Sequence, residues 1–350
     1  MKILLPTFMG DLHSDPNPFC YTLMDEICKH HPEVKVFTKW QLFWSDDILN
    51  YDVLHIMWPE ILIRGGHNAQ ELELRLKLLK ASGVKIVATC HNLHPHYSNN
   101  IFEIESYKLA YSYADTIIHL GEYSRSLIAK QNLNANNVIV PHHVYNTIYD
   151  KKPTREQGIK NLGLDPQNRY ILAMGEFRDD EERALIRIIE REIDGTNLRI
   201  LAPTYKRWVL SRAHPIRTIR SYMDYRAALR LVPNLINKGK YVPNELVTSY
   251  YAVSDICFIQ RKEILNSGNV PMALYMENIV VGPDRGNVGL LLKETGNPTF
   301  NPDDRASVLN AYKQAMKLYI TGQNHKNHDW VMKHCTTESC AEAYYQIYIK

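Results

Sequence analysis

Short apolar runs alternate with longer stretches that mix apolar and charged residues along most of the chain. The short runs suit buried strands, and the mixed stretches of roughly 10 to 15 residues suit amphipathic helices. This alternation predicts βα units arranged around parallel sheets. In the first half the expected strands are Lys2 to Leu5, Val34 to Thr38, Val53 to Met57, Lys85 to Cys90, Thr116 to Leu120 and Asn137 to Val140.

The run Glu71 to Leu79 is ambiguous by period, but its Glu, Lys and Arg content favours a helix. Residues 144–169 have no clear period and contain Pro, Gly, Asn and Asp, which predicts a domain boundary there. The alternation then resumes in the second half. Its expected strands are Tyr170 to Met174, Leu198 to Leu201, Lys240 to Val242, Asp255 to Ile259 and Ile279 to Val281.

The pattern therefore predicts an α/β protein made of two Rossmann-like, doubly wound domains that face an interdomain cleft. We expect the first domain at residues 1–150 and the second at residues 151–325. A helical segment at residues 326–350 is expected to pack back toward the first domain. Ligands of doubly wound folds bind at the carboxyl ends of the strands, so the loops that follow the strands are the places to search.

Composition adds a few exclusions. The 350 residues are 45% hydrophobic and 23% charged, which is ordinary for a globular protein. No apolar run approaches the roughly 18 residues of a spanning helix, and Met1 to Pro6 is too short for a signal-peptide core. The six cysteines form no CxxC pair, so neither a zinc site nor a disulfide framework is indicated, and a reducing cytoplasm fits best.

Charge and histidine are distributed unevenly. Residues 1–150 carry 12 Lys and Arg against 16 Asp and Glu, whereas residues 151–350 carry 29 against 22. The basic second half suggests an anionic ligand, while the net charge of +3 argues against a dedicated nucleic-acid binder. Eleven of the 15 histidines lie between His13 and His143, which concentrates groups able to transfer protons in the acidic half.

The segment that follows the expected strand at Asp255 has the order strand, loop and helix start. Backbone N–H groups at a helix start near Gly268, with Ser267 and Asn266 available as caps, would suit a phosphate. The alternative interpretation is a capped helix without a ligand. A second turn at residues 282–287 is also rich in residues that allow close approach of a ligand.

Several strand-end motifs occur in the order found in one known family. In the second half they are Tyr241-Val242-Pro243-Asn244-Glu245, Asn266-Ser267-Gly268 and Val280-Val281-Gly282-Pro283-Asp284-Arg285-Gly286. In the first half they are Asn17-Pro18-Phe19, Trp58-Pro59-Glu60, Thr89-Cys90-His91-Asn92, Tyr123-Ser124-Arg125 and Pro141-His142-His143. Together they resemble the GT-B glycosyltransferases, most closely the large retaining group, glycosyltransferase family 4, that builds bacterial polysaccharides.

The resemblance implies that the second domain binds a nucleoside diphosphate sugar, with the diphosphate at Ser267, Gly268 and Asn269. It also assigns Val242 and Gly10 to the donor, and it implies no metal and no further cofactor. The family adds an Arg and a Lys after the first strand of this domain. Arg178 supplies the first, but Asp179-Asp180-Glu181-Glu182 stands where the lysine is expected, so Lys206 or Arg207 would replace that charge.

Other positions follow from the same resemblance. His91 would lie beside the donor sugar, while His94 and His96 would lie toward the acceptor; a hydrogen-bonded loop residue is the alternative for each. Asp11 follows the first strand, where relatives approach the donor or acceptor. Met272 stands where many relatives have a carboxylate, which leaves the ribose contact unassigned.

The sequence thus predicts a hexosyltransferase that moves a sugar from a UDP- or GDP-sugar to a glycan or lipid-linked acceptor with retention. A non-catalytic nucleotide-sugar binding protein and a GT-B UDP-sugar epimerase are the alternatives. The segment Lys206 to Arg230 has seven basic residues with Trp208, Tyr222 and Tyr225 among them. A solvated helical face is one interpretation, and contact with anionic lipid is another, which would place the protein in the cytoplasm and at the periphery of the membrane.

Overall fold

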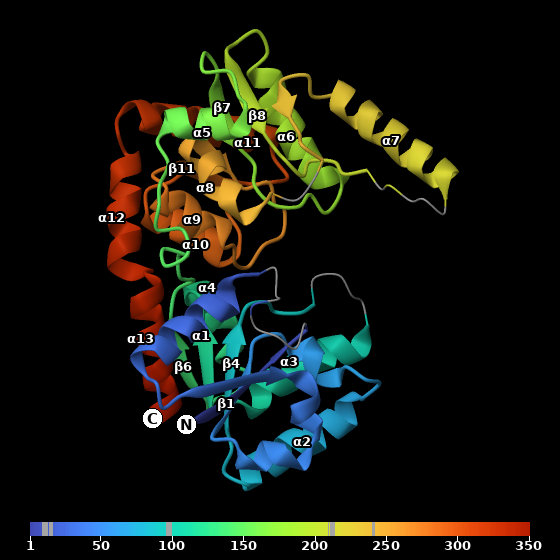
Figure 1. Ribbon diagram of the computed structural model, residues 1–350, viewed down its shortest axis with the longest axis vertical. Coiled ribbons are helices and arrows are strands. Elements are labelled where there is room, and N and C mark those ends of the chain that lie inside the picture. The colour runs from blue at the N-terminus through green and yellow to red at the C-terminus, as the bar shows by residue number, and fades with distance from the viewer. Residues whose placement is uncertain (9–12, 14–16, 96–99, 209, 211–213, 240–241) are drawn as a thin grey trace. The chain divides into compact units, whose positions relative to one another are not determined.

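Two compact units make up the chain. The computed structural model describes residues 1–8, 13, 17–95, 100–208, 210, 214–239 and 242–350. The first unit comprises Met1–Ile148 and His334–Lys350, and the second comprises Tyr149–Lys333 (Figure 1). The chain therefore leaves the first unit after residue 148 and returns to it near its end.

The first unit contains a six-stranded sheet in the order β2-β1-β3-β4-β5-β6, in which all neighbours are parallel. Its strands are β1 (Lys2–Thr7), β2 (Lys35–Lys39), β3 (Val53–Ile56), β4 (Lys85–Cys90), β5 (Thr116–His119) and β6 (Asn136–Ile139). Its α-helices are α1 (Phe19–His30), α2 (Ala69–Ala81), α3 (Ile101–Tyr113), α4 (Glu122–Ile128) and α13 (Thr337–Ile349). Short 3₁₀ helices occupy Trp40–Trp44, Asp46–Asn50 and Pro59–Ile63.

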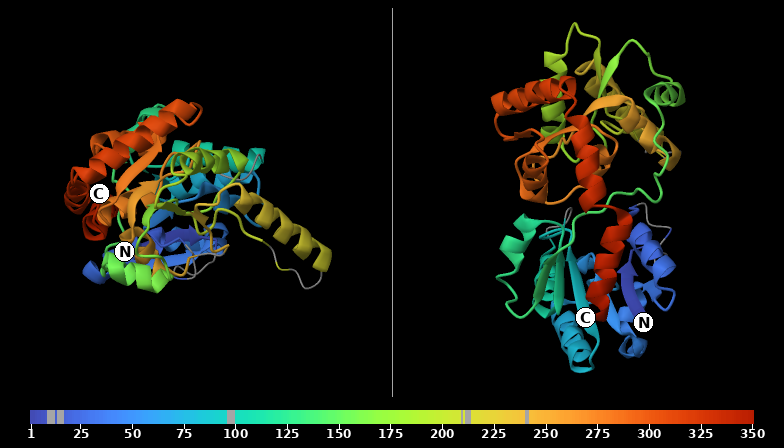
Figure 2. Two further views of the ribbon diagram at one scale, coloured as in Figure 1. Left: turned by 90° about the horizontal axis from the view of Figure 1, so that it is seen from above. Right: turned by 90° about the vertical axis from the view of Figure 1, so that its left-hand side faces the viewer.

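Helix α13 brings the end of the chain onto the first unit, where it packs against α1 (Figure 2). The Tyr348 hydroxyl hydrogen-bonds to Nδ1 of buried His55 at 2.7 Å, and Nε2 of the same ring bonds to Thr89 Oγ1 at 2.8 Å. Burial lowers the pKa of His55 to about 3, so the ring is neutral at physiological pH. A neutral imidazole accepts at one nitrogen and donates at the other, which satisfies both partners.

The second unit contains a six-stranded parallel sheet in the order β12-β11-β10-β7-β8-β9. Its strands are β7 (Arg169–Leu172), β8 (Leu198–Leu201), β9 (Leu235–Ile236), β10 (Ser254–Phe258), β11 (Ile279–Pro283) and β12 (Thr299–Phe300). Its helices are α5 (Arg155–Leu162), α6 (Asp180–Glu192), α7 (Pro215–Arg230), α8 (Asn244–Ala252), α9 (Asn269–Tyr275), α10 (Gly286–Glu294), α11 (Arg305–Ile320) and α12 (Asn324–His334).

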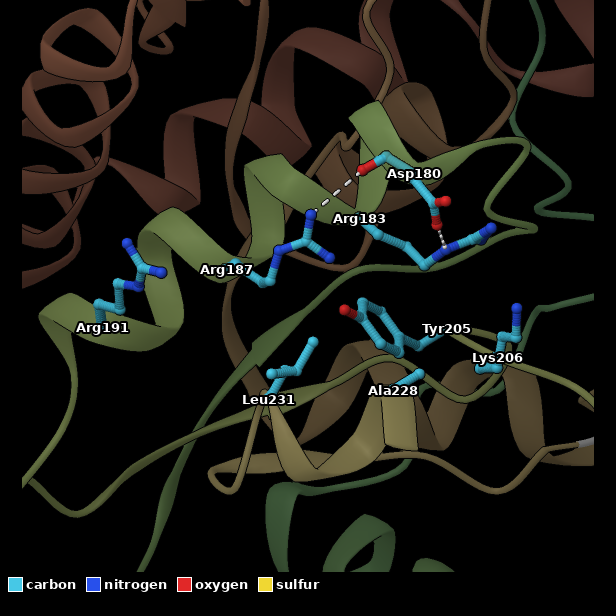
Figure 3. Close-up of a pocket in the computed structure, with 8 residues that line it drawn as sticks. All are labelled: Asp180, Arg183, Arg187, Arg191, Tyr205, Lys206, Ala228 and Leu231. Carbon is cyan, nitrogen blue, oxygen red and sulfur yellow. Dashed lines mark hydrogen bonds and ion pairs between the residues drawn. The ribbon is translucent and has the colours of Figure 1, made fainter. Parts of the chain in front are cut away.

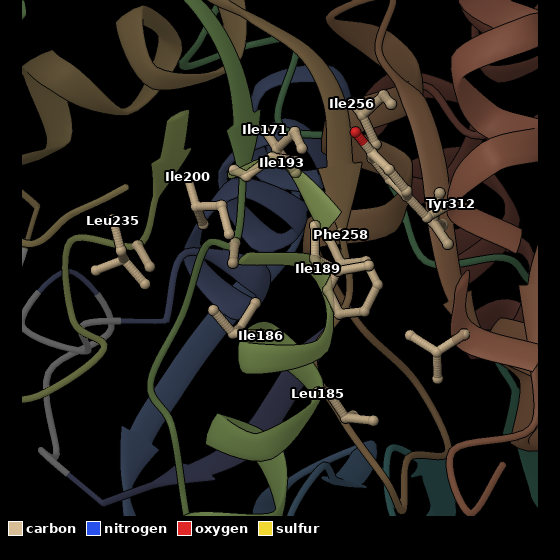
Figure 4. Packing of buried hydrophobic residues seen from close by; sticks show 14 of the residues in the cluster. Ile171, Leu185, Ile186, Ile189, Ile193, Ile200, Leu235, Ile256, Phe258 and Tyr312 are labelled. Carbon is tan, nitrogen blue, oxygen red and sulfur yellow. The ribbon is translucent and has the colours of Figure 1, made fainter. Parts of the chain in front are cut away.

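The core of the second unit lies between this sheet and the helices α6 and α11. Ile171, Ile200, Ile256 and Phe258 project from the strands and meet Ile186 and other apolar residues of α6 (Figure 4). Because apolar residues occupy one side of α6 and charged ones the other, the helix is held by burial of its apolar side. The charged side of α6 faces away from this core.

The predicted α/β class, with two parallel sheets of Rossmann-like type, is confirmed. The helix expected at Glu71 to Leu79 is present as α2. The strand expected at Lys240 to Val242 is wrong: the sheet uses β9, five residues earlier, and Val242 is in no strand, while residues 240–241 lie outside the described part. Within residues 144–169 the structure adds helix α5, whose N-terminus has a capping box formed by Thr154 and Gln157.

Candidate functional site

The order of the second sheet defines a switch point between β7 and β10. Counted within this unit, the strands run 3-2-1-4-5-6 away from β9, and the first and fourth strands are neighbours. The connections after these two strands lead to opposite sides of the sheet, and ligands of such folds bind where the two loops separate. The loops concerned are residues 173–179 and residues 259–268.

Gly175 is the point at which three loops meet. Its backbone has a φ of +97°, and a Cβ there would lie 3.1 Å from Asn269 Nδ2. The Asn269 amide donates to the Met174 carbonyl oxygen at 3.0 Å and accepts from the Tyr251 hydroxyl at 3.2 Å. Thr204, which follows β8, donates to the Gly175 carbonyl oxygen at 2.5 Å. The side chain of Asn269 therefore holds the start of α9 against the end of β7.

The predicted turn at Ser267, Gly268 and Asn269 lies at the start of α9. Gly268 occupies the N-cap position and has no side chain to cap the helix. Of the two expected caps, Ser267 does meet a free N–H of the helix start, since its Oγ accepts from the Asn269 N–H at 3.3 Å. Within the described part of the chain no acceptor meets the Gly268 N–H. That donor and the Ser267 hydroxyl are the groups that this turn offers to an anion.

The turn at Gly286 contacts the loop that carries Ser267 and Gly268. Gly286 has a φ of +59°, and a Cβ there would lie 2.8 Å from Leu265 Cα and against the Ile264 carbonyl oxygen. The Asn287 N–H donates to the Leu265 carbonyl oxygen at 2.9 Å, and the Asn287 amide donates to Asn266 Oδ1 at 2.7 Å. The start of α10 thus fixes the loop that carries Ser267.

Arg178 lies at the end of the loop after β7, and the acidic run behind it has a structural explanation. Asp179 caps α6 by accepting from the Glu182 N–H at 2.8 Å. Glu182 is 3% exposed; its carboxylate accepts from the Arg178 N–H at 2.8 Å and from Arg261 Nη1 at 2.6 Å. Acidic residues in the first turn of a helix also complement its dipole. The run therefore caps α6 and ties it to the loop after β10.

The two basic residues expected to replace the family's lysine have different surroundings. Arg207 forms an ion pair with Glu176. Lys206 lines a cavity of about 500 Å³ together with Arg183, the residue that follows the acidic run (Figure 3). The sequence analysis did not single out Arg183 as a residue of a cavity. It stands directly after the acidic run and one helical turn after Asp179.

For the other residues that the sequence assigned to the donor site, the structure shows no polar group directed to a ligand or does not describe them. Val242 is half-buried and stands directly before Pro243, the N-cap of α8. Met272 is 2% exposed within α9 and offers no polar group for a ribose. Gly10 lies outside the described residues, as do Asp11 and His96.

In the first unit His91 follows β4 directly and lies in an aromatic environment. Its side chain is 8% exposed. The ring stacks on Trp58 with centroids 5.2 Å apart and meets the Phe19 edge at 4.4 Å. Phe19 also contacts His142 and His143, which come after β6. His94 is exposed on the same loop.

Burial keeps the two neighbouring histidines neutral. It lowers the pKa of His142 to about 4, and it lowers the pKa of His143 well below its usual range. Thr22 Oγ1 lies 2.8 Å from His143 Nε2. His142 and His143 are thus uncharged packing residues. His91, the third histidine in contact with Phe19, directly follows a strand of the sheet.

Two kinds of feature are absent from the described residues. Within them, no three His, Cys, Asp or Glu side chains are grouped as metal ligands would be. No helix among them has both the length and the apolar character that crossing a membrane requires.

Comparison with known proteins supports the architecture. No family model matches the chain, and no curated protein sequence matches it significantly. Sucrose-phosphate synthase from Thermosynechococcus elongatus is similar in structure, with a TM-score of 0.72 at 13% identity over 99% of this chain and 98% of that one. HepE from Anabaena, in complex with UDP, gives a TM-score of 0.70 at 11% identity over 99% of each chain. The fold is therefore GT-B.

Proposed function

We propose that this GT-B chain is a glycosyltransferase that moves a hexose from a nucleoside diphosphate sugar to a glycan or lipid-linked acceptor with retention. The observation that carries the proposal is the convergence of the Arg178 loop and the Ser267–Gly268 turn at the switch point of the second sheet. One loop brings a guanidinium and the other brings N–H and hydroxyl donors. That combination suits a diphosphate.

The similar structures support the choice of donor. HepE has been solved with UDP, with UDP and glucose, and with UDP-glucose. A trehalose-6-phosphate protein of E. coli, similar at a TM-score of 0.65 and 13% identity over 99% of each chain, was solved with UDP-2-fluoro glucose. We therefore place UDP-hexoses first among the donors to be tested, with GDP-hexoses second.

The mechanism that we propose is electrostatic. As the glycosidic bond breaks, negative charge develops on the departing diphosphate, and donors fixed in advance stabilise it without reorganisation. Arg178, the Gly268 N–H and the Ser267 hydroxyl would supply that stabilisation, with Lys206 as the second cation. The acceptor hydroxyl, held in a fixed orientation, would form its C–O bond to the anomeric carbon on the face that the diphosphate leaves, which retains the configuration. Its proton would pass to the departing diphosphate oxygen, so the step needs no further base.

Release of nucleoside diphosphate tests the proposal. Purified protein is incubated with UDP- and GDP-hexoses, with and without glycan and lipid-linked acceptors. We expect diphosphate release that depends on an acceptor. Binding without any turnover would instead identify a nucleotide-sugar binding protein, and conversion of the sugar without an acceptor would identify an epimerase. A protein that binds none of the nucleotides would overturn the proposal.

Gly268→Val is expected to weaken nucleoside diphosphate binding by at least about tenfold, or about 1.4 kcal/mol. The side chain would obstruct the approach of the phosphate to the Gly268 N–H. The backbone at this position has φ −66° and ψ −20°, which any residue can adopt, so the fold should tolerate the change. Calorimetric titration with UDP and GDP measures the effect. Gly268→Ala, with a smaller obstruction, should give an intermediate loss, and equal affinities in all three proteins would contradict the placement.

His91→Ala is expected to reduce turnover and leave the affinity for free UDP or GDP nearly unchanged. His91 belongs to the first unit, whereas the proposed nucleotide ligands belong to the second. Steady-state rates and nucleotide titrations, measured on the same preparations, separate the two effects.

His91→Asn provides the matched variant. An amide still donates and accepts hydrogen bonds but does not titrate, so it should recover part of the activity if His91 positions the sugar. Near-complete loss in both variants, with an activity limb at the imidazole pKa, would instead indicate a general base. Loss of nucleotide binding alone would exclude both roles.

We also propose that the segment Lys206 to Arg230 contacts anionic lipid, which would suit a lipid-linked acceptor. Helix α7 has no buried residue. Ile216, Ile219 and Met223 are 81%, 60% and 65% exposed, and their spacing places them on one side of the helix. Arg220 and Arg226 flank this apolar stripe, and Arg230 follows it at the end of the helix. An exposed apolar stripe with flanking arginines is typical of helices that lie in a membrane interface.

Ile216→Asp combined with Met223→Asp should lower the partition onto phosphatidylglycerol vesicles by about tenfold or more, because the apolar stripe is lost and negative charge is added. Vesicle sedimentation measures the bound fraction. Leu74→Asp combined with Ile320→Asp is the matched control, since those side chains are 62% and 76% exposed on other helices. An equal decrease in the control pair would remove the support for α7.

A further inference from the structure

A basic cavity lies beside the charged side of α6. It is lined by Arg183, Arg187 and Arg191 of that helix, by Tyr205 and Lys206 after β8, and by Ala228 and Leu231 at the end of α7 and just beyond it. Asp180 completes the lining. Figure 3 shows the three arginines following one another along α6, with Tyr205 and Lys206 on the segment that faces them.

The charges of this cavity are mostly uncompensated. The arginines are four residues apart, so they occupy one side of the helix. Arg183 pairs with Asp180 at 2.9 Å, and hydrogen bonding to Arg183 lowers the pKa of Asp180. Arg187 donates to the Asp180 carbonyl oxygen at 3.5 Å and lies beside the Tyr205 hydroxyl. Within the described residues no carboxylate pairs with Arg187, Arg191 or Lys206.

Tyr205 places a buried polar group in the same cavity. The residue is 1% exposed and its hydroxyl lies beside the Arg187 guanidinium, but no group in the described part of the chain accepts a hydrogen bond from it. Burial raises the pKa of Tyr205 and the charge and hydrogen bonding of Arg187 oppose that rise, so the phenol stays protonated at neutral pH. A buried O–H without an acceptor is costly, and a bound anion that accepts from it would remove that cost.

We propose that this cavity is a second anion site that binds a phosphate group. Arg187 and Arg191 would bind its oxygens and the Tyr205 hydroxyl would donate to one of them. Guanidinium groups match the oxygens of phosphate in geometry and charge. The phosphate comes either from a small soluble phosphate compound or from the headgroup of an anionic phospholipid, since the cavity adjoins α7. The inference does not rest on the proposed glycosyl transfer, because Arg187, Arg191 and Tyr205 take no part in that mechanism. Lys206 lines the cavity and is also the second cation of the proposed transfer, but it is not among the groups assigned to this phosphate.

Titration with inorganic phosphate at low salt tests the site. We expect Arg187→Gln combined with Arg191→Gln to weaken phosphate binding by at least about tenfold. Arg305→Gln combined with Lys317→Gln, an equal change of charge at exposed positions of α11, should leave it unchanged. Absence of phosphate binding by the unaltered protein, or an equal loss in the control pair, would overturn the proposal.

Tyr205→Phe is the second, milder variant. It removes only a hydroxyl whose O–H meets no acceptor among the described residues, so the unfolding temperature should not fall, while phosphate affinity should fall about tenfold. A Tyr205→Phe protein that is less stable and binds phosphate normally would show that the hydroxyl serves the fold, and would overturn the assignment of this residue.

Vesicles distinguish the two sources of the phosphate. Sedimentation with phosphatidylglycerol vesicles is measured for the unaltered protein, for the Arg187 and Arg191 variant and for the α7 variant. If the source is a headgroup, the arginine variant should lose vesicle binding and inorganic phosphate should compete with the vesicles. If it is a soluble compound, the arginine variant should lose phosphate binding only. In both cases the α7 variant, Ile216→Asp combined with Met223→Asp, should keep its affinity for inorganic phosphate. Loss of that affinity would place the phosphate on α7 instead of in the cavity.

Discussion

Arg178→Ala is expected to lower turnover about 100-fold while the affinity for the intact donor changes far less. The guanidinium would act on charge that appears only as the glycosidic bond breaks, so its removal should affect the transition state more than the ground state. Its loop is held by the hydrogen bond from the Arg178 N–H to Glu182, which the substitution leaves in place. Turnover numbers and donor dissociation constants, determined together, measure the difference.

Two further comparisons make the assignment of Arg178 specific. Arg305→Ala, at an exposed position of α11, removes the same charge and should leave turnover unchanged. Lys206→Ala and Arg207→Ala should each cost less than Arg178→Ala. If these two abolish activity and Arg178→Ala has no effect, the cation that neutralises the diphosphate has been misassigned.

Gly286→Ala is expected to destabilise the second unit by about 2 kcal/mol or more. Two costs combine there: a left-handed backbone conformation costs an alanine about 1 kcal/mol or more, and a forced overlap with packed backbone costs about 1 to 3 kcal/mol. The overlap involves Leu265 Cα and the Ile264 carbonyl oxygen, which cannot move as a side-chain end can. Denaturant unfolding, followed by circular dichroism, measures the change.

Gly322→Ala is the matched control for this prediction. Gly322 also has a positive φ, +74°, in the same unit, but a Cβ there meets nothing within 4 Å among the described residues. It should therefore show the conformational cost alone. If both variants lose the same stability, the close approach of the two glycine turns contributes nothing, and the Ser267 loop is not supported by α10.

The parallel sheets could be predicted because their strands are buried on both faces. Strands such as β4 and β10 appear in the sequence as continuous apolar or β-branched runs, and their bounds differ from the expected ones by at most one residue. β9 has two residues and gives no such run, so the pattern near Lys240 was mistaken for it. Helix α5 was missed because its apolar positions are few, although Thr154, Gln157 and the left-handed Gly163 mark its ends.

The local geometry of the proposed site could be predicted where a single loop carries it, and could not where several loops must meet. The Ser267–Gly268 turn follows from one strand, one loop and one helix start. The role of the Asn269 side chain depends on Met174 and Tyr251, which are far away in the sequence. The acidic run after Arg178 was interpreted as a departure because the sequence does not show that Glu182 is buried against Arg261. The basic cavity is likewise assembled from separate segments.

The position of α13 sets the order in which the protein can be completed during synthesis. The sheet of the first unit is made from residues before 140, but Tyr344 and Tyr348, which lie in its core, are translated only after the second unit, residues 149–333. A ribosome working at roughly 5 to 20 residues per second would add the whole second unit before they emerge. Until α13 is made, the α1 side of the first unit's core is therefore uncovered. During that interval its uncovered apolar surface is open to aggregation, and a chaperone that binds it would protect the nascent chain.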